Sequence, residues 1–262
     1  MNGFEIVPIP GGGVSLRSLE HRETFHPGVG PMEEAKVLHV AQHRFEERMR
    51  AGEEFVIWDV GLGAAANAVA VMEALAGSPA PVWLRSFDKT LEPLRFALEH
   101  AGRLDYPARW SSEIGQLLDG GEVRAGELRW TAEIGDFRER VRECTGPGPD
   151  AVLFDPYSPK ANPEMWTEEI FRALRERADG DCTLTTYSRG TVTRVKLLRA
   201  GWCVGRGAAT GEKEETTIAA TRLELLREPL GVEWLGRVSR SAAFGGEAPG
   251  IARELAACPQ MR

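Results

Sequence analysis

The stretch Phe55-Val-Ile-Trp-Asp-Val-Gly-Leu-Gly-Ala-Ala-Ala-Asn67 decides the fold of this 262-residue chain. Residues 55–60 are mostly apolar, which is typical of a strand buried on both faces of a parallel sheet. Gly61 and Gly63 then predict a tight turn into a helix, whose free N–H groups and positive dipole end can face a ligand. A plain strand-to-helix turn has the same pattern, so the glycines alone leave both interpretations open.

The chain continues outward from this stretch as an alternation of strands and helices. The sequence predicts further strands at residues 82–87, 128–131, 151–154 and 183–187, and helices at 67–75, 91–101, 163–178 and 191–199. Such alternation predicts an α/β fold, in which helices cover both faces of a mostly parallel sheet. Residues 202–205 and 216–220 are predicted to form an antiparallel pair at the edge of that sheet.

The two ends of the chain are less regular. Two apolar runs around Gly11-Gly12-Gly13 predict a hairpin within residues 4–16, and apolar residues at helical spacing predict a helix over 33–50. After residue 229 the periodicity is weak, so this tail either packs on the domain or is partly disordered. We therefore divide the chain into an N-terminal extension (1–50), a central domain (51–228) and an unassigned tail (229–262).

Composition excludes some classes of protein. There are 32 Lys and Arg against 39 Asp and Glu, and the net charge of −7 argues mildly against a protein coated in nucleic acid, although a local basic patch can still bind phosphates. The most apolar stretch, residues 64–72, is too short for a membrane span, and the N-terminus lacks a secretory pattern. We therefore expect a cytosolic protein without a membrane partner.

The metal-ligating residue types give no metal-site pattern. The four cysteines are widely spaced, which favours reduced thiols over a zinc cage or a disulfide framework. His39 and His43 lie one helical turn apart, but no Glu follows His39 as in the His-Glu-x-x-His zinc motif. We interpret these histidines as a polar helix face and expect no metal.

Acidic residues near the glycine turn indicate its ligand. Asp88 ends the second predicted strand, where nucleotide-binding folds place the carboxylate that holds ribose hydroxyls; capping of the next helix is the alternative. Alanines occupy positions 64–66, where a dinucleotide fingerprint needs its third glycine, and Asp59 would repel a pyrophosphate but can receive an ammonium group. These features favour S-adenosylmethionine over NAD. Asp136 follows the third strand and is either an adenine contact or a solvated loop residue.

The richest motif is Asp150-Ala-Val-Leu-Phe-Asp-Pro-Tyr-Ser-Pro-Lys-Ala-Asn-Pro-Glu-Met-Trp166. Asp155 ends a predicted strand at the carboxyl edge of the sheet, where open α/β folds bind ligands. Its Asp-Pro-Tyr sequence is similar to the Asp/Asn-Pro-Pro-Tyr loop of amino-group methyltransferases. A buried carboxylate there can anchor an aliphatic ammonium and accept its proton. Trp166, Ile170 and Leu174 recur every four residues, which favours core packing for Trp166.

The stretch from Phe154 to Thr167 resembles the Asp-(Gly/Pro/Ala)-(Phe/Tyr)-(Ala/Ser)-Pro-x-x-Asn-Pro-(Glu/Asp)-(Met/Leu)-Trp loop of the MnmC-like methyltransferases. Residues 18–27 with 33–35, 87–89, and 188–194 with 200–202 resemble further segments of that family. The resemblance implies a Rossmann-like class I methyltransferase fold. It also implies methylation of 5-aminomethyl-(2-thio)uridine at the tRNA wobble position, with S-adenosylmethionine as the cofactor.

The resemblance also assigns roles to single residues. Asp155 would be the catalytic carboxylate, Asp88 the ribose ligand and Asp136 an adenine contact. Gly61 and Gly63 would form the cofactor loop. Beyond the resemblance, we expect Asp59 and Asn67 also to contact the cofactor, and Tyr157, Lys160, Arg189 and Arg194 to contact the substrate.

Some positions depart from the family pattern. Ala65 replaces the third loop glycine, a basic element reads Gly211-Glu-Lys-Glu-Glu215, and Thr193 replaces the first of two paired arginines. The chain therefore has fewer cations at these positions than the family pattern, which weakens the case for tRNA as the substrate. Two alternatives stay open: a methyltransferase acting on another amine, of a small molecule or a protein, and a non-catalytic cofactor-binding protein. Likewise, residues 189, 194, 196, 199 and 206 form either a phosphate patch or a solvated helix face. Because the chain ends at Arg262, we expect a stand-alone enzyme without the flavin-dependent oxidase half of some members.

Overall fold

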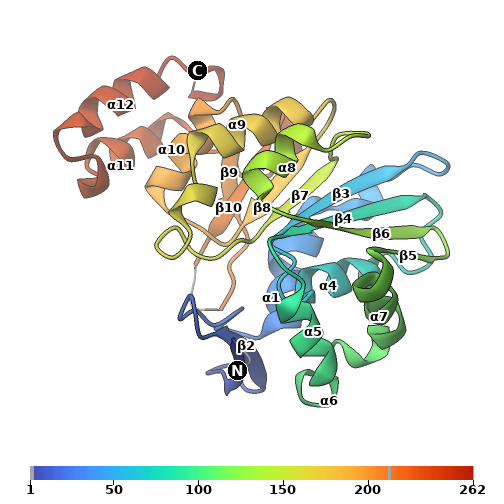
Figure 1. The fold of residues 1–262 in the computed structure, drawn as a ribbon. Coiled ribbons are helices and arrows are strands. Elements are labelled where there is room, and N and C mark those ends of the chain that lie inside the picture. The colour runs from blue at the N-terminus through green and yellow to red at the C-terminus, as the bar shows by residue number, and fades with distance from the viewer. Residues whose placement is uncertain (1–2, 212–213, 262) are drawn as a thin grey trace.

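A mostly parallel sheet forms the centre of the computed structural model, which describes residues 3–211 and 214–261 (Figure 1). Within these residues the order of its eight strands is β5-β6-β4-β3-β7-β8-β10-β9. The strands are β3 (Phe55–Val60), β4 (Val82–Asp88), β5 (Glu122–Ala125), β6 (Leu128–Ile134), β7 (Ala151–Phe154), β8 (Thr183–Thr186), β9 (Cys203–Gly207) and β10 (Thr216–Ala220). β10 runs antiparallel to both β8 and β9, which confirms the predicted edge pair. β5 pairs antiparallel with β6 and was not predicted.

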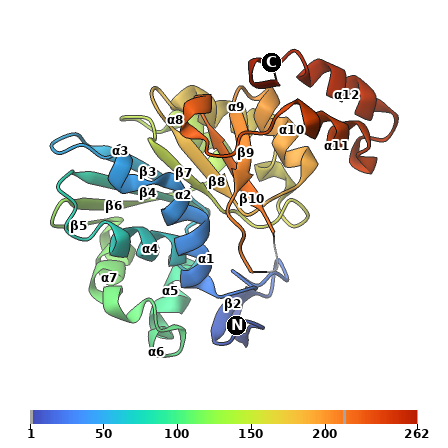
Figure 2. The same cartoon turned by 180° about the vertical axis from the view of Figure 1, so that it is seen from behind.

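Helices cover both faces of the sheet, as the alternating pattern predicts (Figures 1 and 2). On one face lie α4 (Ala66–Ala74), α5 (Glu92–Glu99), α6 (Ala101–Leu104) and α7 (Ser111–Gly120). On the other lie α8 (Phe137–Glu143), α9 (Glu168–Arg177) and α10 (Thr191–Arg199). Alternate residues of β3 enter the two cores: Val56 and Trp58 pack with α8 and α9, whereas Phe55 and Ile57 pack with α4. Both faces of this strand are therefore buried, as its apolar sequence requires.

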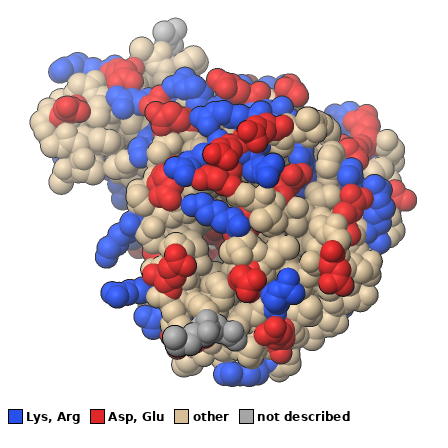
Figure 3. Space-filling model, viewed as in Figure 1, with Lys and Arg blue, Asp and Glu red and all other residues tan. Residues whose placement is uncertain are grey.

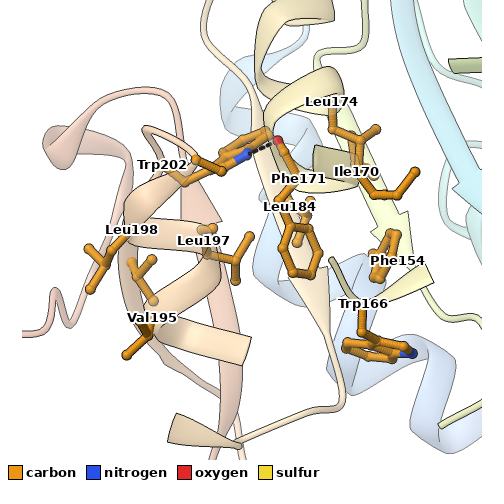
Figure 4. Close-up of a cluster of buried hydrophobic side chains, with 14 of the residues drawn as sticks. Phe154, Trp166, Ile170, Phe171, Leu174, Leu184, Val195, Leu197, Leu198 and Trp202 are labelled. Carbon is orange, nitrogen blue, oxygen red and sulfur yellow. Dashed lines mark hydrogen bonds between the residues drawn. The ribbon is translucent and has the colours of Figure 1, made fainter. Parts of the chain in front are cut away.

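The core on the α9 side fixes the loop that follows β7. In Figure 4 the ring of Phe154 lies between α9 and the loop, with centroids 5.2 Å from Trp166 and 5.3 Å from Phe171. Trp166 is 2% exposed, which confirms its predicted place in the core. Its Nε1 donates to the Tyr157 carbonyl oxygen over 2.8 Å, so this ring also anchors the loop backbone.

The N-terminal residues form the predicted hairpin and an interrupted helix. β1 (Phe4–Pro8) pairs antiparallel with β2 (Val14–Ser18) in a separate small sheet. The predicted single helix is instead α1 (Pro31–Ala35), a π turn η1 (Lys36–Val40), α2 (Ala41–His43) and α3 (Phe45–Arg48). Arg44 interrupts it with a left-handed backbone, φ 50°. This segment packs against α4 and β8, and so lies over the main sheet.

The C-terminal residues are ordered helices packed on the domain. α11 (Leu235–Ser239) and α12 (Ala248–Leu255) place Val238, Ile251 and Leu255 in the same core as Trp202. Short 3₁₀ turns complete the chain at η2 (Ala108–Trp110), η3 (Pro163–Met165), η4 (Leu223–Leu225), η5 (Val232–Trp234), η6 (Ala242–Glu247) and η7 (Pro259–Met261). In the part of the chain that the structure describes, no helix combines the length and apolar character that a membrane crossing requires.

Candidate active site

A cavity of about 890 Å³ opens where β3, β4, β6 and β7 end. Its size lies within the roughly 300–1,000 Å³ of typical ligand pockets. Several predicted site residues line it: Gly61, Gly63, Asn67, Asp88, Asp155 and Tyr157. The N-terminal segment closes one side with Phe25, His26 and Glu34. The topology therefore brings the sequence motifs together at the carboxyl edge of the sheet.

The two glycines allow close packing around the turn after β3. Gly61 has φ +97°, and a Cβ there would lie 2.7 Å from the Asp155 carbonyl oxygen. Gly63 has φ +51°, and its Cβ would lie 3.0 Å from the Phe25 ring. At both positions the nearest atoms that a Cβ would meet belong to the protein. The glycines hold the loop of Asp155 and the N-terminal segment against the turn.

Asp88 lies at the cavity, and its carboxylate accepts a backbone hydrogen bond. Its Oδ2 accepts a hydrogen bond from the Gly63 backbone N–H over 2.8 Å. Burial raises the pKa of Asp88, and backbone N–H groups of Gly63, Thr90 and Lys89 act against that rise. α5 begins after Leu91 without a side-chain cap, so capping of this helix does not explain Asp88.

Asp59 does not line the cavity, which corrects its predicted contact with the cofactor. It is fully buried in β3, and its Oδ2 accepts from the Ser86 hydroxyl over 2.8 Å. Trp130 Nε1 donates in turn to Ser86 Oγ over 2.9 Å. Burial, aided by repulsion from Asp155 and Asp88, raises the pKa of Asp59 to about 7. The position of Asp59 in an apolar strand indicated that it is buried, but not that its side chain points away from the cavity.

Asp155 lies among three side chains that can donate to it. Its Oδ2 is 2.8 Å from Asn67 Nδ2, 3.8 Å from His26 Nε2 and 3.8 Å from His39 Nε2. The carboxylate is 12% exposed. Burial alone would raise the pKa of Asp155, but the two histidines and the Asn67 amide outweigh burial, so its pKa lies below the ordinary value. Asp155 is therefore an anion at neutral pH.

The histidines near Asp155 were missed by the sequence analysis. His39 and His43 are fully buried beneath β8, so the predicted polar helix face is wrong for both. His26 lies between Asp155 and Glu34, whose Oε2 is 3.9 Å from His26 Nδ1. The one-turn spacing of His39 and His43, and the resemblance of residues 18–27 to a family segment, were the available signals. Within the described residues no group of three or more His, Cys, Asp or Glu side chains is placed to hold a metal ion.

The N-terminal segment also holds the loop after Asp155. Glu23 accepts from the backbone N–H of Ser158 over 3.0 Å and from its hydroxyl. The Tyr157 ring lies 4.1 Å from the His21 ring and 5.5 Å from the Phe25 ring, centroid to centroid. Tyr157 therefore forms part of an aromatic wall of the cavity.

The other predicted contacts lie apart from the cavity. Asp136 caps α8 and pairs with Arg138, which lowers the pKa of Asp136 to about 2, and its neighbours Gly135 and Phe137 line the cavity instead. Lys160 and Arg189 are exposed on the surface.

Arg194 corrects a predicted substrate contact. It is fully buried and donates to Thr217 Oγ1, the Thr216 carbonyl oxygen and Glu215. A side chain committed in this way holds β10 in place and does not reach a substrate.

Most of the Lys and Arg side chains of the suggested phosphate patch already bind other groups of this chain. Lys196 donates to the Trp166 carbonyl oxygen, Arg199 pairs with Glu254, and Arg206 pairs with Glu215. Figure 3 shows Lys and Arg interspersed with Asp and Glu on the face in view. The basic element of residues 211–215 lies partly outside the described residues, at 212–213.

The residues at the cavity fit S-adenosylmethionine. The cavity is lined by the Asp88 carboxylate, an acceptor of the kind that ribose hydroxyls require, and by the largely buried rings of Phe87 and Phe137. Asn67 Oδ1 is buried, with no hydrogen-bond partner among the described residues, and can accept from an ammonium group.

Comparisons with known proteins agree with this geometry. Residues 106–222 match a family described as S-adenosyl-L-methionine-dependent methyltransferase. MnmC2 from Aquifex aeolicus, a crystal structure, is 25% identical, with a TM-score of 0.73 over 97% of this chain and 84% of that chain. The predicted resemblance to the MnmC-like methyltransferases is confirmed. The fold class, the enzyme class and S-adenosylmethionine as the cofactor are confirmed with it.

The MnmC relatives in the comparison are longer proteins. The tRNA 5-methylaminomethyl-2-thiouridine biosynthesis bifunctional protein MnmC of Burkholderia vietnamiensis is 29% identical over 72% of this chain and 31% of its own length. The same protein of Azoarcus sp. is 29% identical over 88% of this chain and 36% of its own length. The chain thus spans about a third of the length of these curated relatives.

Proposed function

We propose that this MnmC-like methyltransferase methylates the aminomethyl nitrogen of 5-aminomethyl-(2-thio)uridine at the wobble position of tRNA. The observation that carries the proposal is the anionic Asp155 at the wall of the cavity, ringed by Asn67, His26 and His39. The names of the MnmC relatives, which refer to 5-methylaminomethyl-2-thiouridine in tRNA, support this acceptor.

The chemistry follows from what Asp155 can do to an amine. When bound, S-adenosylmethionine supplies an electrophilic methyl group. An aliphatic ammonium, with a pKa near that of lysine at about 10.4, has no free lone pair and must lose a proton first. Asp155 would anchor the ammonium by charge, accept its proton on Oδ and leave the nitrogen lone pair directed into the cavity. Positioning of this kind supplies much of the acceleration.

The remaining residues would hold the reactants and exclude water. Asp88 would bind the ribose hydroxyls, Gly61 and Gly63 would shape the turn, and Asn67 would hold both Asp155 and the cofactor. The aromatic wall of Phe25 and Tyr157 would cover the acceptor base. We place the reaction in the cytoplasm, with tRNA as the partner.

The direct test is methyl transfer by the purified chain. We expect transfer of labelled methyl groups to tRNA that bears aminomethyl-uridine, and none to the same tRNA without the aminomethyl group. Transfer to another amine but not to this tRNA would refute the proposed acceptor. Cofactor binding without transfer to any amine would favour a non-catalytic protein.

Variants of Asp155 separate its role from a structural one. We expect D155N to lower kcat about 10²–10⁴-fold, the usual contribution of a general base, while the Kd for the cofactor changes little. The matched control is D119N, an exposed aspartate of α7, which should leave both values unchanged. Loss of cofactor binding together with turnover in D155N would contradict the proposed role.

A further inference from the structure

A buried line of polar side chains connects Asp155 with the opposite end of β8. Thr183 and Thr185 lie two residues apart on β8 and so face the same side, toward the segment that carries His39 and His43. His39 Nδ1 is 2.8 Å from Thr185 Oγ1, which is 3.0 Å from His43 Nε2. His43 Nδ1 is 2.7 Å from Thr183 Oγ1, and Arg48 Nη1 donates to that oxygen over 2.7 Å.

One direction of this line gives every polar hydrogen in it a partner. Arg48 only donates, so its guanidinium donates to Thr183, and the threonine hydrogen can then go to His43 Nδ1. In the reverse direction Thr183 would accept from both Arg48 and His43, and its own hydrogen would have no partner in the line. Burial and the neighbouring Arg48 hold the pKa of His43 well below its ordinary value, so its ring is neutral and carries one hydrogen, on Nε2. That hydrogen goes to Thr185, whose own hydrogen then goes to His39 Nδ1.

His39, the last member of the line, carries its hydrogen on Nε2, the ring nitrogen that faces Asp155. With Nδ1 accepting, a neutral His39 carries its hydrogen on Nε2. His39 Nε2 is buried, has no hydrogen-bond partner among the described residues, and lies 3.8 Å from Asp155 Oδ2. Contacts of this length at catalytic groups commonly tighten when the reactants bind.

We propose that Arg48, Thr183, His43 and Thr185 fix His39 as a positioning residue, with its Nε2–H directed at the Asp155 carboxylate. In this role His39 stabilises and orients the carboxylate anion of Asp155, which receives the acceptor amine. That role toward the amine rests on the proposed function. The line does not carry the proton away: His39 Nε2 already bears hydrogen, and the line ends at an arginine, which takes up no proton. The proton from the amine stays on Asp155 until it is released through the cavity.

Thr185→Val tests this directly, because valine keeps the shape of threonine and removes the hydroxyl. Without the Thr185 hydrogen, His39 is free to place its own hydrogen on Nδ1 and turn a lone pair toward Asp155. Loss of this donor raises the pKa of Asp155. Because activity needs the carboxylate, we expect the acid limb of the pH–kcat/KM profile to move up by about one unit, with about tenfold lower kcat/KM below that limb.

Three other charged or titratable groups face Asp155, and one lies behind them. They are His26 from the N-terminal segment, Asp59 of β3 and Tyr187 after β8, with Glu34 of α1 behind His26. All of them stay in place in the variants, so the difference between two profiles reports on His39.

Matched variants separate this effect from damage to the core. T185S keeps the hydroxyl, and we expect it to restore the wild-type profile. T186V changes the adjacent buried threonine, whose hydroxyl has no partner among the described residues, and we expect no shift of the profile. An equal shift in T185V and T186V, or none in a folded T185V, would overturn the inference.

A readout independent of methyl transfer completes the test. Nitrogen-15 NMR of labelled imidazoles reports which ring nitrogen carries hydrogen. We expect His39 to carry it on Nε2 in the wild type and to shift toward Nδ1 in T185V. A wild-type His39 with hydrogen on Nδ1 would overturn the inference even if methyl transfer is confirmed. The wild-type tautomer stays measurable if the tRNA acceptor proves wrong.

Discussion

Replacing Asp59 by Asn is expected to stabilise the protein above neutral pH. The carboxylate lies fully buried in β3, its Oδ2 accepts from Ser86, and its Oδ1 has no partner among the described residues. Its pKa is raised from 3.8 to about 7. The folded protein therefore holds this proton more tightly than the unfolded chain does. Stability contributed by the protonated acid is lost as pH rises from about 4 through about 7.

The magnitude follows from the shift in pKa. A rise from 3.8 to about 7 corresponds to about 4 kcal/mol of folding free energy lost once the acid is ionised. In D59N the amide oxygen can still accept from Ser86, but the amide hydrogens lie where Oδ1 has no partner, which costs about 1–3 kcal/mol. We expect a net gain of about 1–3 kcal/mol at pH 8.

Urea unfolding of wild type and D59N between pH 5 and pH 8 measures this difference. The gain should disappear toward pH 5, because the wild type regains about 2.7 kcal/mol between pH 8 and pH 5 as Asp59 takes up its proton, whereas the cost of the amide does not depend on pH. Groups common to both proteins cancel in the comparison, and D119N, which changes an exposed aspartate of α7 in the same way, is the matched control. A D59N variant that gains no stability between pH 5 and pH 8 would refute the reasoning.

Three further substitutions test the turn and the core. Gly61→Ala should lose about 2–4 kcal/mol in urea unfolding, because φ is +97° and the new Cβ meets the Asp155 carbonyl oxygen; a loss below 1 kcal/mol would contradict this. Ala65→Gly should stay within about 1 kcal/mol of wild type, because relief of its left-handed backbone, φ 64°, offsets loss of a buried methyl. Calorimetry should show unchanged cofactor affinity in that variant, and weaker binding would show that the alanine matters. Trp202→Phe should cost about 2–3 kcal/mol, since it removes the indole donor to the Phe171 carbonyl oxygen and leaves a gap in the core; an unchanged urea midpoint would count against that estimate.

The central strands β3 and β7 could be predicted because each is an almost continuous apolar run. β5 was missed because Glu-Val-Arg-Ala is a short edge strand with exposed polar residues, which gives little signal. The helices of the C-terminal tail were missed because they are short and irregular, and Gly245 breaks the backbone between them with φ 51°. Arg44 similarly splits the helix predicted over 33–50, and nothing in the local sequence marks that break.

The candidate site could be predicted where a residue follows a strand, and not where its partners come from distant segments. Asp88 and Asp155 lie at strand ends, so the topology alone brings them to the cavity. His39 and His43 meet threonines about 140 positions away, and a pattern of polar residues in one helix cannot reveal such partners. Arg194 follows the same logic, because its helix faces β10, which comes later in the chain.

The N-terminal segment supplies side chains to the candidate active site although it contributes no strand to the large sheet. The residues that form the site therefore begin earlier in the chain than the sheet does. A polypeptide begun at residue 51 would retain every strand of the large sheet and the glycine turn. It would lack both imidazoles beside Asp155 and the glutamate that holds Ser158. If Asp155 acts on the acceptor amine as we propose, such a fragment would keep Asp88 but lose the imidazoles that hold Asp155 as an anion, together with Phe25 from the wall of the same cavity.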